Sequence, residues 1–251
     1  MDWQTIRLDE VDSTSSFLKR NAAELPHRLV VRADTQTGGR GRLGRKWSSP
    51  RGGLYMSLLL RPAPEPEVAA LLPLVGAYVI CRIFTGQTGV PALVKWPNDV
   101  IVPGGKMAGI LAEYGGRREP WLVVGFGLNL TDSPRIDRGG GMPAEAWSDY
   151  GVPPDPEEAQ SFVLEGLDRL WPAGEGNPLP AIRSRVERLL WMRGREVRAS
   201  VGGMTLRGVV EGLDDLGHLR LYGPEGAAAL DSGEIRPEPL ESPTTIPGGA
   251  T

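Results

Sequence analysis

Residues 39–44 combine glycine and arginine in a pattern that could bind an anionic group. The segment reads Gly-Arg-Gly-Arg-Leu-Gly. Its glycines let backbone N–H groups approach a ligand closely, and its arginines offer paired donors for phosphate or carboxylate. The wider stretch 32–51 holds six basic residues and one acid, Asp34. No Gly-Lys-Ser/Thr closes the segment, so it is not a P-loop. Taken alone, it predicts a mobile loop that either binds an anion or is merely solvated, with a nucleic-acid contact as a minor alternative.

Two lysines flank a predicted hairpin further along the chain. Residues 95–99 read Lys-Trp-Pro-Asn-Asp, and Lys106 follows a Pro-Gly-Gly turn. Only four of the 28 basic residues are lysines, which leaves 24 arginines. Surface charges beside a turn would be the ordinary interpretation of Lys95 and Lys106, but the scarcity of lysine favours a chemical role. A compact amine in a half-buried site could neutralise a carboxylate and a phosphate that approach one another.

A third segment, residues 125–129, ends an apolar run with Gly-Phe-Gly-Leu-Asn. The glycines could let a flat ligand lie against the backbone and form a hydrogen bond with Asn129. Glycines inside a strand more often mark a β-bulge, which is the alternative here.

The elements that must position these segments follow an α+β pattern. Ser13 is a plausible N-cap for a helix, and Pro73 is expected to bend or delay a second, buried helix. The expected helices cover 13–25, 68–84, 157–171 and 179–191, and the expected strands cover 29–31, 53–60, 92–96, 100–102, 107–114 and 121–130. After Gly194 the chain changes to short runs broken by glycine, at 196–201, 205–212, 218–221 and 233–235, which predict a small barrel of about five strands.

Composition excludes several classes of protein. The 251 residues are 40% hydrophobic and 24% charged, with a net charge of −3, as in globular proteins. A lone cysteine, Cys81, with His27 and His218 as the two histidines, argues against disulfides and against a metal site held by the protein. The N-terminus lacks a basic segment followed by an apolar run, and no run of ~18 consecutive apolar residues occurs. We therefore expect a cytoplasmic protein that does not enter a membrane.

In this order and spacing the motifs resemble those of the biotin protein ligases. The resemblance rests on Asp12-Ser13-Thr14 and on residues 36–47, 95–99, 106–111 and 125–129, and it covers nearly the whole chain. It implies a catalytic domain over 1–192 with the mixed sheet of class II synthetases. It also implies a small SH3-like β-barrel over 193–239, ending in a Ser-Gly-Glu-Ile strand, and a disordered tail over 240–251.

The resemblance also implies roles for individual residues. Lys106, Arg40 and Arg42 would be catalytic. Biotin would contact Ser13, Thr14, Ser15, Gln36, Gly39, Arg40, Gly41, Arg42, Lys106 and Gly109, and ATP would contact Arg42, Arg45, Trp47, Asn98, Lys106 and Asn129. Ser15 stands where the family usually has asparagine, and its hydroxyl is shorter and offers fewer donors than an amide.

The implied reaction has two steps. The carboxylate of biotin attacks the α-phosphate of ATP to give biotinyl-5′-adenylate, and a lysine of a biotin carboxyl carrier protein domain then takes the biotin. Mg²⁺ would arrive with the ATP phosphates. Repressor members of the family carry a winged helix-turn-helix domain ahead of the catalytic domain. This chain reaches Ser13 after twelve residues, so we expect no role in DNA binding. A homodimer is left open.

Two other functions stay open at this point. A lipoate or octanoate ligase or transferase would share the fold and similar chemistry, but the Gly-Arg-Gly-Arg and Lys-Trp-Pro-Asn-Asp segments favour biotin. A nucleic-acid-binding module would use the basic loop and the terminal barrel, and the acidic pI of about 5.6 counts against it.

Overall fold

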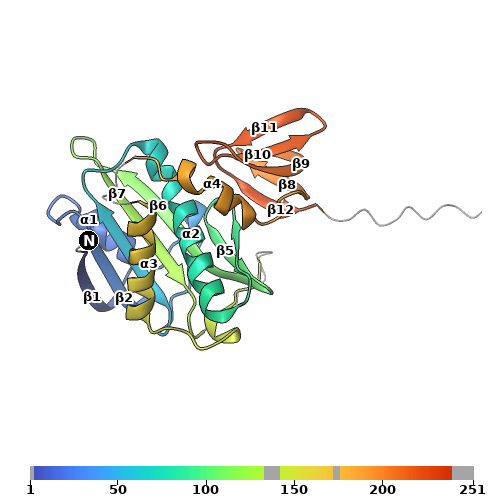
Figure 1. Cartoon of the computed structure of the whole chain (residues 1–251). Coiled ribbons are helices and arrows are strands. Elements are labelled where there is room, and N and C mark those ends of the chain that lie inside the picture. The colour runs from blue at the N-terminus through green and yellow to red at the C-terminus, as the bar shows by residue number, and fades with distance from the viewer. Residues whose placement is uncertain (1–2, 133–141, 172–175, 239–251) are drawn as a thin grey trace, which may run out of the picture.

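The computed structural model describes residues 3–132, 142–171 and 176–238, and it builds them around two β-sheets (Figure 1). The larger sheet has the strand order β1-β2-β3-β7-β6-β5-β4, in which only β1 and β2 are parallel. Its strands are β1 (Gln4–Val11), β2 (Leu29–Gln36), β3 (Leu54–Leu60), β4 (Leu93–Lys95), β5 (Asp99–Val102), β6 (Gly105–Gly115) and β7 (Trp121–Leu128). All seven residues of β3 are buried, as expected for a central strand that is covered on both faces.

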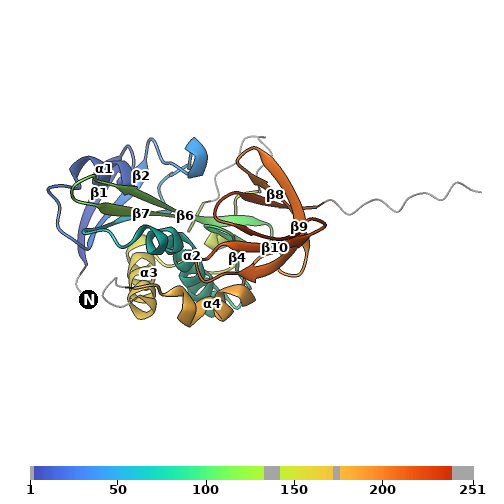
Figure 2. The same ribbon diagram turned by 90° about the horizontal axis from the view of Figure 1, so that it is seen from above.

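Helices cover both faces of this sheet, so the amino-terminal part of the chain has three layers (Figure 2). α1 (Thr14–Asn21) packs on one face, where Leu18 joins a small apolar cluster with Val31, Leu59 and Val123. The opposite face carries α2 (Pro66–Thr88), α3 (Pro156–Leu170) and α4 (Leu179–Arg188) over the main hydrophobic core. The predicted α+β class is confirmed.

The longest helix, α2, is the core helix of this layer. Among the described residues, it is the one helix that is long and apolar enough to cross a membrane, with a mean hydropathy of 2.0 over 18 residues. However, 67% of those residues are buried inside the protein, as in a core helix. The helix begins at Pro66, seven residues before Pro73. The expectation that Pro73 delays the helix is therefore wrong. Pro66, not Pro73, marks the start of the helix, because a proline in the first turn lacks an N–H that would have no partner there in any case.

The second sheet contains β8 (Glu196–Val201), β9 (Met204–Leu213), β10 (Leu219–Gly223), β11 (Gly226–Leu230) and β12 (Glu234–Pro237). All its pairings are antiparallel, and the order is β11-β10-β9-β8-β12. The sheet has the predicted number of strands, about five, although only four of them were located from the sequence, and the predicted closed barrel is not confirmed. Closure requires the two edge strands to pair, and among the described residues β11 and β12 form no ladder with each other.

The two sheets share one hydrophobic core. Val197 and Leu213 of the second sheet belong to the same buried cluster as Trp96 and Val94. The indole Nε1 of Trp96 donates to the carbonyl oxygen of Gly217 at 3.0 Å in a buried position. This contact ties the turn after β4 to the loop before β10.

Several element boundaries differ from the predicted ones. β1 was not predicted, because its alternation of Ile6 and Leu8 with polar residues is short and lies at an exposed edge. The helix predicted over 179–191 ends at Arg188, since the chain then pairs with β4: Leu189 accepts from the N–H of Val94, and Trp191 donates to its carbonyl. β11 was also missed. The predicted disordered tail over 240–251 lies outside the described residues.

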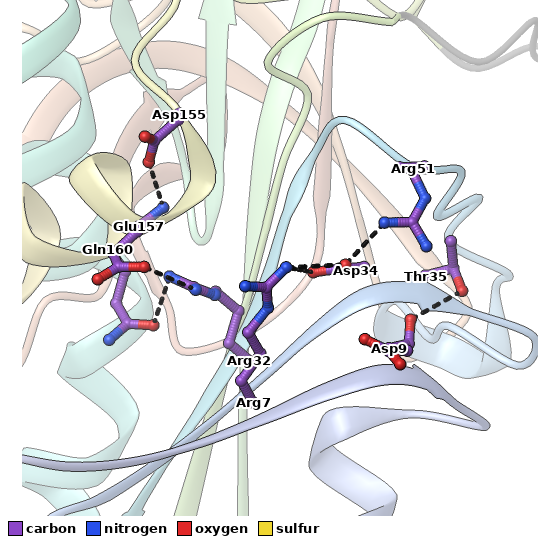
Figure 3. A network of polar contacts seen from close by, with 9 residues as sticks. All are labelled: Arg7, Asp9, Arg32, Asp34, Thr35, Arg51, Asp155, Glu157 and Gln160. Atoms are coloured by element: carbon purple, nitrogen blue, oxygen red, sulfur yellow. Dashed lines mark hydrogen bonds and ion pairs between the residues drawn. The ribbon is translucent and has the colours of Figure 1, made fainter.

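A polar network attaches the β1–β2 edge to α3 (Figure 3). The side chain of Arg32 on β2 is only 6% exposed, and its guanidinium reaches Glu157 and Gln160 of α3, each at 3.4 Å. Asp34, two residues further along β2, accepts from Arg7 at 3.1 Å and from Arg51 at 2.7 Å. Asp34 thereby joins β2 to β1 and to the segment that leads into β3.

Close packing of α2 on α3 depends on the absence of a side chain at Gly166. A methyl group there would lie 2.5 Å from Cγ1 of Val79, and the β-branched valine has little rotamer freedom to move away. We expect Gly166→Ala to lower the free energy of unfolding by about 1–3 kcal/mol. Gly86→Ala is the control, because Gly86 lies in α2 with no atom within 4 Å of an added methyl group. It should raise stability by up to about 1 kcal/mol. Urea unfolding measures both, and equal effects would contradict this packing.

Candidate active site

A large cavity, of about 1130 Å³, lies where the basic loop (residues 39–47), the first turn of α1 and the strands β6 and β7 meet. Residues 233–235 of the second sheet also line it. All the residues assigned above to biotin or ATP lie on its wall: Ser13, Thr14, Ser15, Gln36, Gly39, Arg40, Gly41, Arg42, Arg45, Trp47, Asn98, Lys106, Gly109 and Asn129. The structure therefore gathers motifs that are up to 116 positions apart (13 to 129) around one cavity.

Hydroxyl and amide groups form one end of the cavity. Ser13 is the N-cap of α1, as predicted, and its side chain accepts from the N–H of Ser16. The backbone N–H of Thr14 donates to Oε1 of Gln36 at 2.9 Å. Beneath them lies Ser57 of β3, which is fully buried and whose Oγ is 2.7 Å from Oγ1 of Thr14. Sequence reasoning missed Ser57, whose position inside an apolar strand gave no signal of a functional role.

The basic loop is held by several contacts of its arginines. A single 3₁₀ turn, Arg42–Gly44, interrupts it. Arg40 donates to Oγ of Ser16 at 2.8 Å. Arg42 donates to Oδ1 of Asn98 at 3.2 Å and to the carbonyl of Gly233 at 3.3 Å. Burial lowers the pKa of the Arg42 guanidinium, which nevertheless stays charged at any physiological pH.

Lys106 lies at the centre of the wall. Its Nζ is 2.7 Å from Oδ1 of Asp99 and 5.2 Å from the centre of the Trp47 ring. The indole can lie this close to the sheet because Gly127 and Gly109 carry no side chain: a methyl group at Gly127 would come within 2.6 Å of the indole Nε1, and one at Gly109 within 3.3 Å of the ring. Strand β7 pairs with both neighbours without a register shift, so its glycines do not mark a bulge. The indole of Trp47 covers Gly109 and Gly127, so they do not leave a bare backbone surface for a ligand.

Two buried polar atoms on the wall have no protein partner. Asn129 is 1% exposed, and its amide nitrogen donates to the carbonyl of Glu145 at 3.0 Å, while its Oδ1 accepts from no described group. Nε1 of Trp47 is also buried without a partner. Because burying an unpaired polar atom is costly, one acceptor and one donor are here available to a ligand.

Charge around the cavity is mostly positive. Lys95 lies 5.8 Å from the ring of Trp191, and burial lowers the pKa of its amine. With Arg40, Arg42 and Lys106 it lines a cavity whose wall also carries two carboxylates, those of Asp99 and Glu234. Converging cations of this kind suit a ligand that carries several negative charges.

The second sheet adds a contact that sequence reasoning missed. Glu234 begins β12, and its Oε2 is 2.5 Å from the guanidinium of Arg45 in the basic loop. The hydrogen bond from Arg45 lowers the pKa of Glu234, so this carboxylate stays charged well below neutral pH. The Ser-Gly-Glu-Ile pattern was noticed in the sequence, but nothing in it indicated that the glutamate reaches the loop.

Comparison with known proteins adds independent information. Residues 8–129 match the model of the biotin/lipoate A/B protein ligase family. The chain is 33% identical over 240 residues to a biotin--[acetyl-CoA-carboxylase] ligase of Paracoccus denitrificans, covering 91% of this chain and 98% of that protein. It is 30% identical to the bifunctional ligase/repressor BirA of Escherichia coli, covering 85% and 68% respectively. The solved biotin protein ligase of Aquifex aeolicus in complex with biotin and ATP is 31% identical, with a TM-score of 0.76 and 93% and 97% coverage.

The contact between Arg45 and Glu234 should limit the opening of the basic loop. We expect Glu234→Gln to speed tryptic cleavage after Arg42 and Arg45 about two- to fivefold, since a partly exposed ion pair contributes up to about 1 kcal/mol. Glu225→Gln is the control, because Glu225 is exposed in the β10–β11 turn and makes no ion pair among the described residues. Mass spectrometry of timed digests locates the cuts. Equal cleavage of the two variants would show that the contact does not hold the loop.

Proposed function

The chain belongs to the biotin protein ligases, and on that premise we propose how its cavity divides the work of an ATP-dependent biotin ligase. The observation that carries the proposal is that a hydroxyl and amide surface and a cluster of six cationic side chains share one cavity. Biotin would lie with its ring system against the hydroxyl and amide groups of Ser13, Thr14 and Gln36. Its carboxylate would then point toward Lys106 and the basic loop, where the triphosphate of ATP also binds.

In the first step a carboxylate oxygen of biotin attacks the α-phosphorus of ATP. A new P–O bond forms, the bond to the β-phosphate oxygen breaks, and pyrophosphate leaves. The obstacle is repulsion between two anions. We assign its relief to Lys106, Arg40 and Arg42, which are already directed at the cavity and need little reorganisation when charge develops.

In the second step the neutral amine of a carrier lysine attacks the carbonyl carbon of biotinyl-5′-adenylate. An amide bond forms, the bond to the phosphate oxygen breaks, AMP leaves, and the amine nitrogen loses one proton to solvent. Water would destroy the mixed anhydride between the two steps. The basic loop, with Gly39 and Gly41 giving it close access to the ligand, would exclude water by lying over the intermediate.

The nucleotide would occupy the side of the cavity formed by Arg45, Trp47, Asn98 and Asn129. The free Oδ1 of Asn129 suits an amino group such as that of adenine, and the free indole N–H of Trp47 suits an acceptor. Mg²⁺ would enter with the ATP phosphates. No group of three His, Cys, Asp or Glu side chains gathers in the described ranges, so phosphate oxygens and water would supply most of its ligands, and Asp99 would be the adjacent carboxylate.

Partners and domain limits are further parts of the proposal. The acceptor would be a biotin carboxyl carrier protein domain of acetyl-CoA carboxylase, as the name of the Paracoccus relative suggests. Residues 193–239 would be an SH3-like domain that packs on a class II synthetase-like domain over 1–192. Enzyme and carrier would meet in the cytoplasm, where ATP is available. The homodimer stays a prediction.

A lipoate or octanoate ligase is the second candidate, because the matching family model includes lipoate enzymes. Those acids have apolar ends that could not use the remaining hydrogen-bonding capacity of Ser13, Thr14 and Gln36. The cavity therefore favours an acid with a polar ring.

An exchange assay tests this choice. Biotin should support exchange of labelled pyrophosphate into ATP at a rate at least about a hundredfold above that with lipoate or octanoate, because a site built to pair polar groups rejects analogues that lack them. Each acid is offered separately at equal concentration. Comparable exchange with lipoate would overturn the proposal.

Lys106 should be needed for chemistry more than for folding. We expect Lys106→Ala to slow biotin-dependent exchange about 10²-fold, the typical cost of removing one preorganised charge-stabilising group. Lys19→Ala is a matched control: Lys19 is 24% exposed and paired with Glu113 at 2.5 Å, and Lys106 is 27% exposed and paired with Asp99 at 2.7 Å. Both variants lose one ion pair, so similar losses of thermal stability are expected. Unchanged exchange in Lys106→Ala would remove this residue from the mechanism.

A further inference from the structure

A chain of hydroxyl groups runs beneath the polar end of the cavity. Oγ of Ser57 is 2.9 Å from Oγ of Ser15 and 2.7 Å from Oγ1 of Thr14. Oγ1 of Thr14 is 3.3 Å from Oε1 of Gln36, whose Nε2 donates to Ser49 at 2.8 Å. Ser57 does not line the cavity, but Thr14, Ser15 and Gln36 do. It therefore acts on a ligand only through its neighbours.

The direction of proton donation along this chain can be assigned by starting from one backbone group. The N–H of Thr14 can only donate, so the amide atom that it contacts is the oxygen of Gln36. That oxygen can only accept, and the Thr14 hydroxyl lies 3.3 Å from it, so we assign the Thr14 proton to Gln36. On this assignment Oγ1 of Thr14 accepts from Ser57, and Ser57 accepts from Ser15.

This direction decides what the cavity offers a ligand. Thr14 and Ser15 have both given their protons inward, so each can present only lone pairs to the cavity. Ser13 differs, because its oxygen accepts from the N–H of Ser16 and its own proton stays available. The Ser13 hydroxyl is then a donor, and the Thr14 and Ser15 hydroxyls are acceptors. This set is complementary to a cyclic urea, whose C=O accepts and whose two N–H groups donate.

We propose that Ser57 is a positioning residue that orients the Thr14 and Ser15 hydroxyls as acceptors for the ureido N–H groups of the substrate. The inference rests on the proposed binding of biotin and adds a specificity determinant that has no contact with the ligand. Ser57 is itself 0% exposed, so water cannot take over its role without a rearrangement of the strand.

The same geometry accounts for the serine at position 15. A methyl group at Gly125, the β7 residue paired with Ser57, would come within 2.6 Å of Oγ of Ser15 and 3.4 Å of Oγ of Ser57. The two hydroxyls fit together in the space that Gly125 leaves. A longer amide at position 15 would have to leave this space, so Ser15 and Ser57 work as a pair.

The test is a thermodynamic cycle that combines a protein change with a ligand change. Dissociation constants of biotin and of its two mono-N-methyl derivatives are measured by titration for the wild type and for Ser57→Ala. We expect Ser57→Ala to weaken biotin binding about tenfold, while kcat of exchange and KM for ATP change less than about twofold. At the nitrogen that faces Thr14 or Ser15, the penalty for methylation should be about tenfold smaller in Ser57→Ala than in the wild type.

A purely structural role would give a different result. The steric cost of the methyl group is common to both proteins, so an equal penalty in the two would overturn the inference. Val31→Ala is the control: Val31 is the β2 residue paired with Ser57, it is 0% exposed, and it packs toward α1. It should lower the melting temperature and leave the methylation penalty unchanged.

Two further outcomes separate this inference from the proposed function. If the wild type does not bind biotin, the proposed function itself fails. If Ser57→Ala does not fold, Ser57→Cys keeps the shape of the side chain with a much weaker donor, and it should reduce the methylation penalty in the same direction. A full penalty in a folded Ser57→Cys would also overturn the inference.

Discussion

The placement of the Trp47 indole against the sheet is the constraint on which the cavity depends. The ring occupies space that side chains at positions 109 and 127 would fill. By lying there, it brings the end of the basic loop onto β6 and β7 and gives Lys106 an aromatic surface 5.2 Å away. A cation between an aromatic face and a carboxylate is held in one place without being buried. The position of Lys106 therefore depends on two glycines, Gly109 and Gly127, which leave room for the indole beside it.

The cavity also depends on the shared core of the two sheets. Trp96 follows β4, and its buried bond to Gly217 anchors the loop before β10. Contacts from Arg42 and Arg45 to Gly233 and Glu234 then depend on where that core places β12. The second sheet is consequently part of the wall, and a change in its packing would be felt at the basic loop.

Local sequence patterns were sufficient to find residues that line the cavity but not the partners of those residues. The glycine-arginine loop, Lys106 and Asn129 could be recognised because their residue types are unusual for a loop, a hairpin or a strand end. Ser57 and Glu234 could not, because a serine in an apolar strand and a glutamate at a strand start are ordinary until the fold brings them to Thr14 and Arg45. Strand β1 and the open edges of the second sheet were missed for a related reason: pairing is decided by distant strands rather than by local alternation.

The near-absence of lysine has a consequence for an enzyme that makes an acylating agent. An adenylate reacts with amines in their neutral form, and arginine side chains do not become neutral in proteins. With 24 arginines among 28 basic residues, the chain obtains its positive charge almost entirely from groups that the intermediate cannot acylate. Lys19 and Lys106 are each engaged with a carboxylate, and Lys95 is partly covered beside Trp191. Lys46, exposed on the cavity wall, is the exception. The enzyme thus offers its own product few targets, and an adenylate molecule that waits in the cavity is preserved for the incoming carrier.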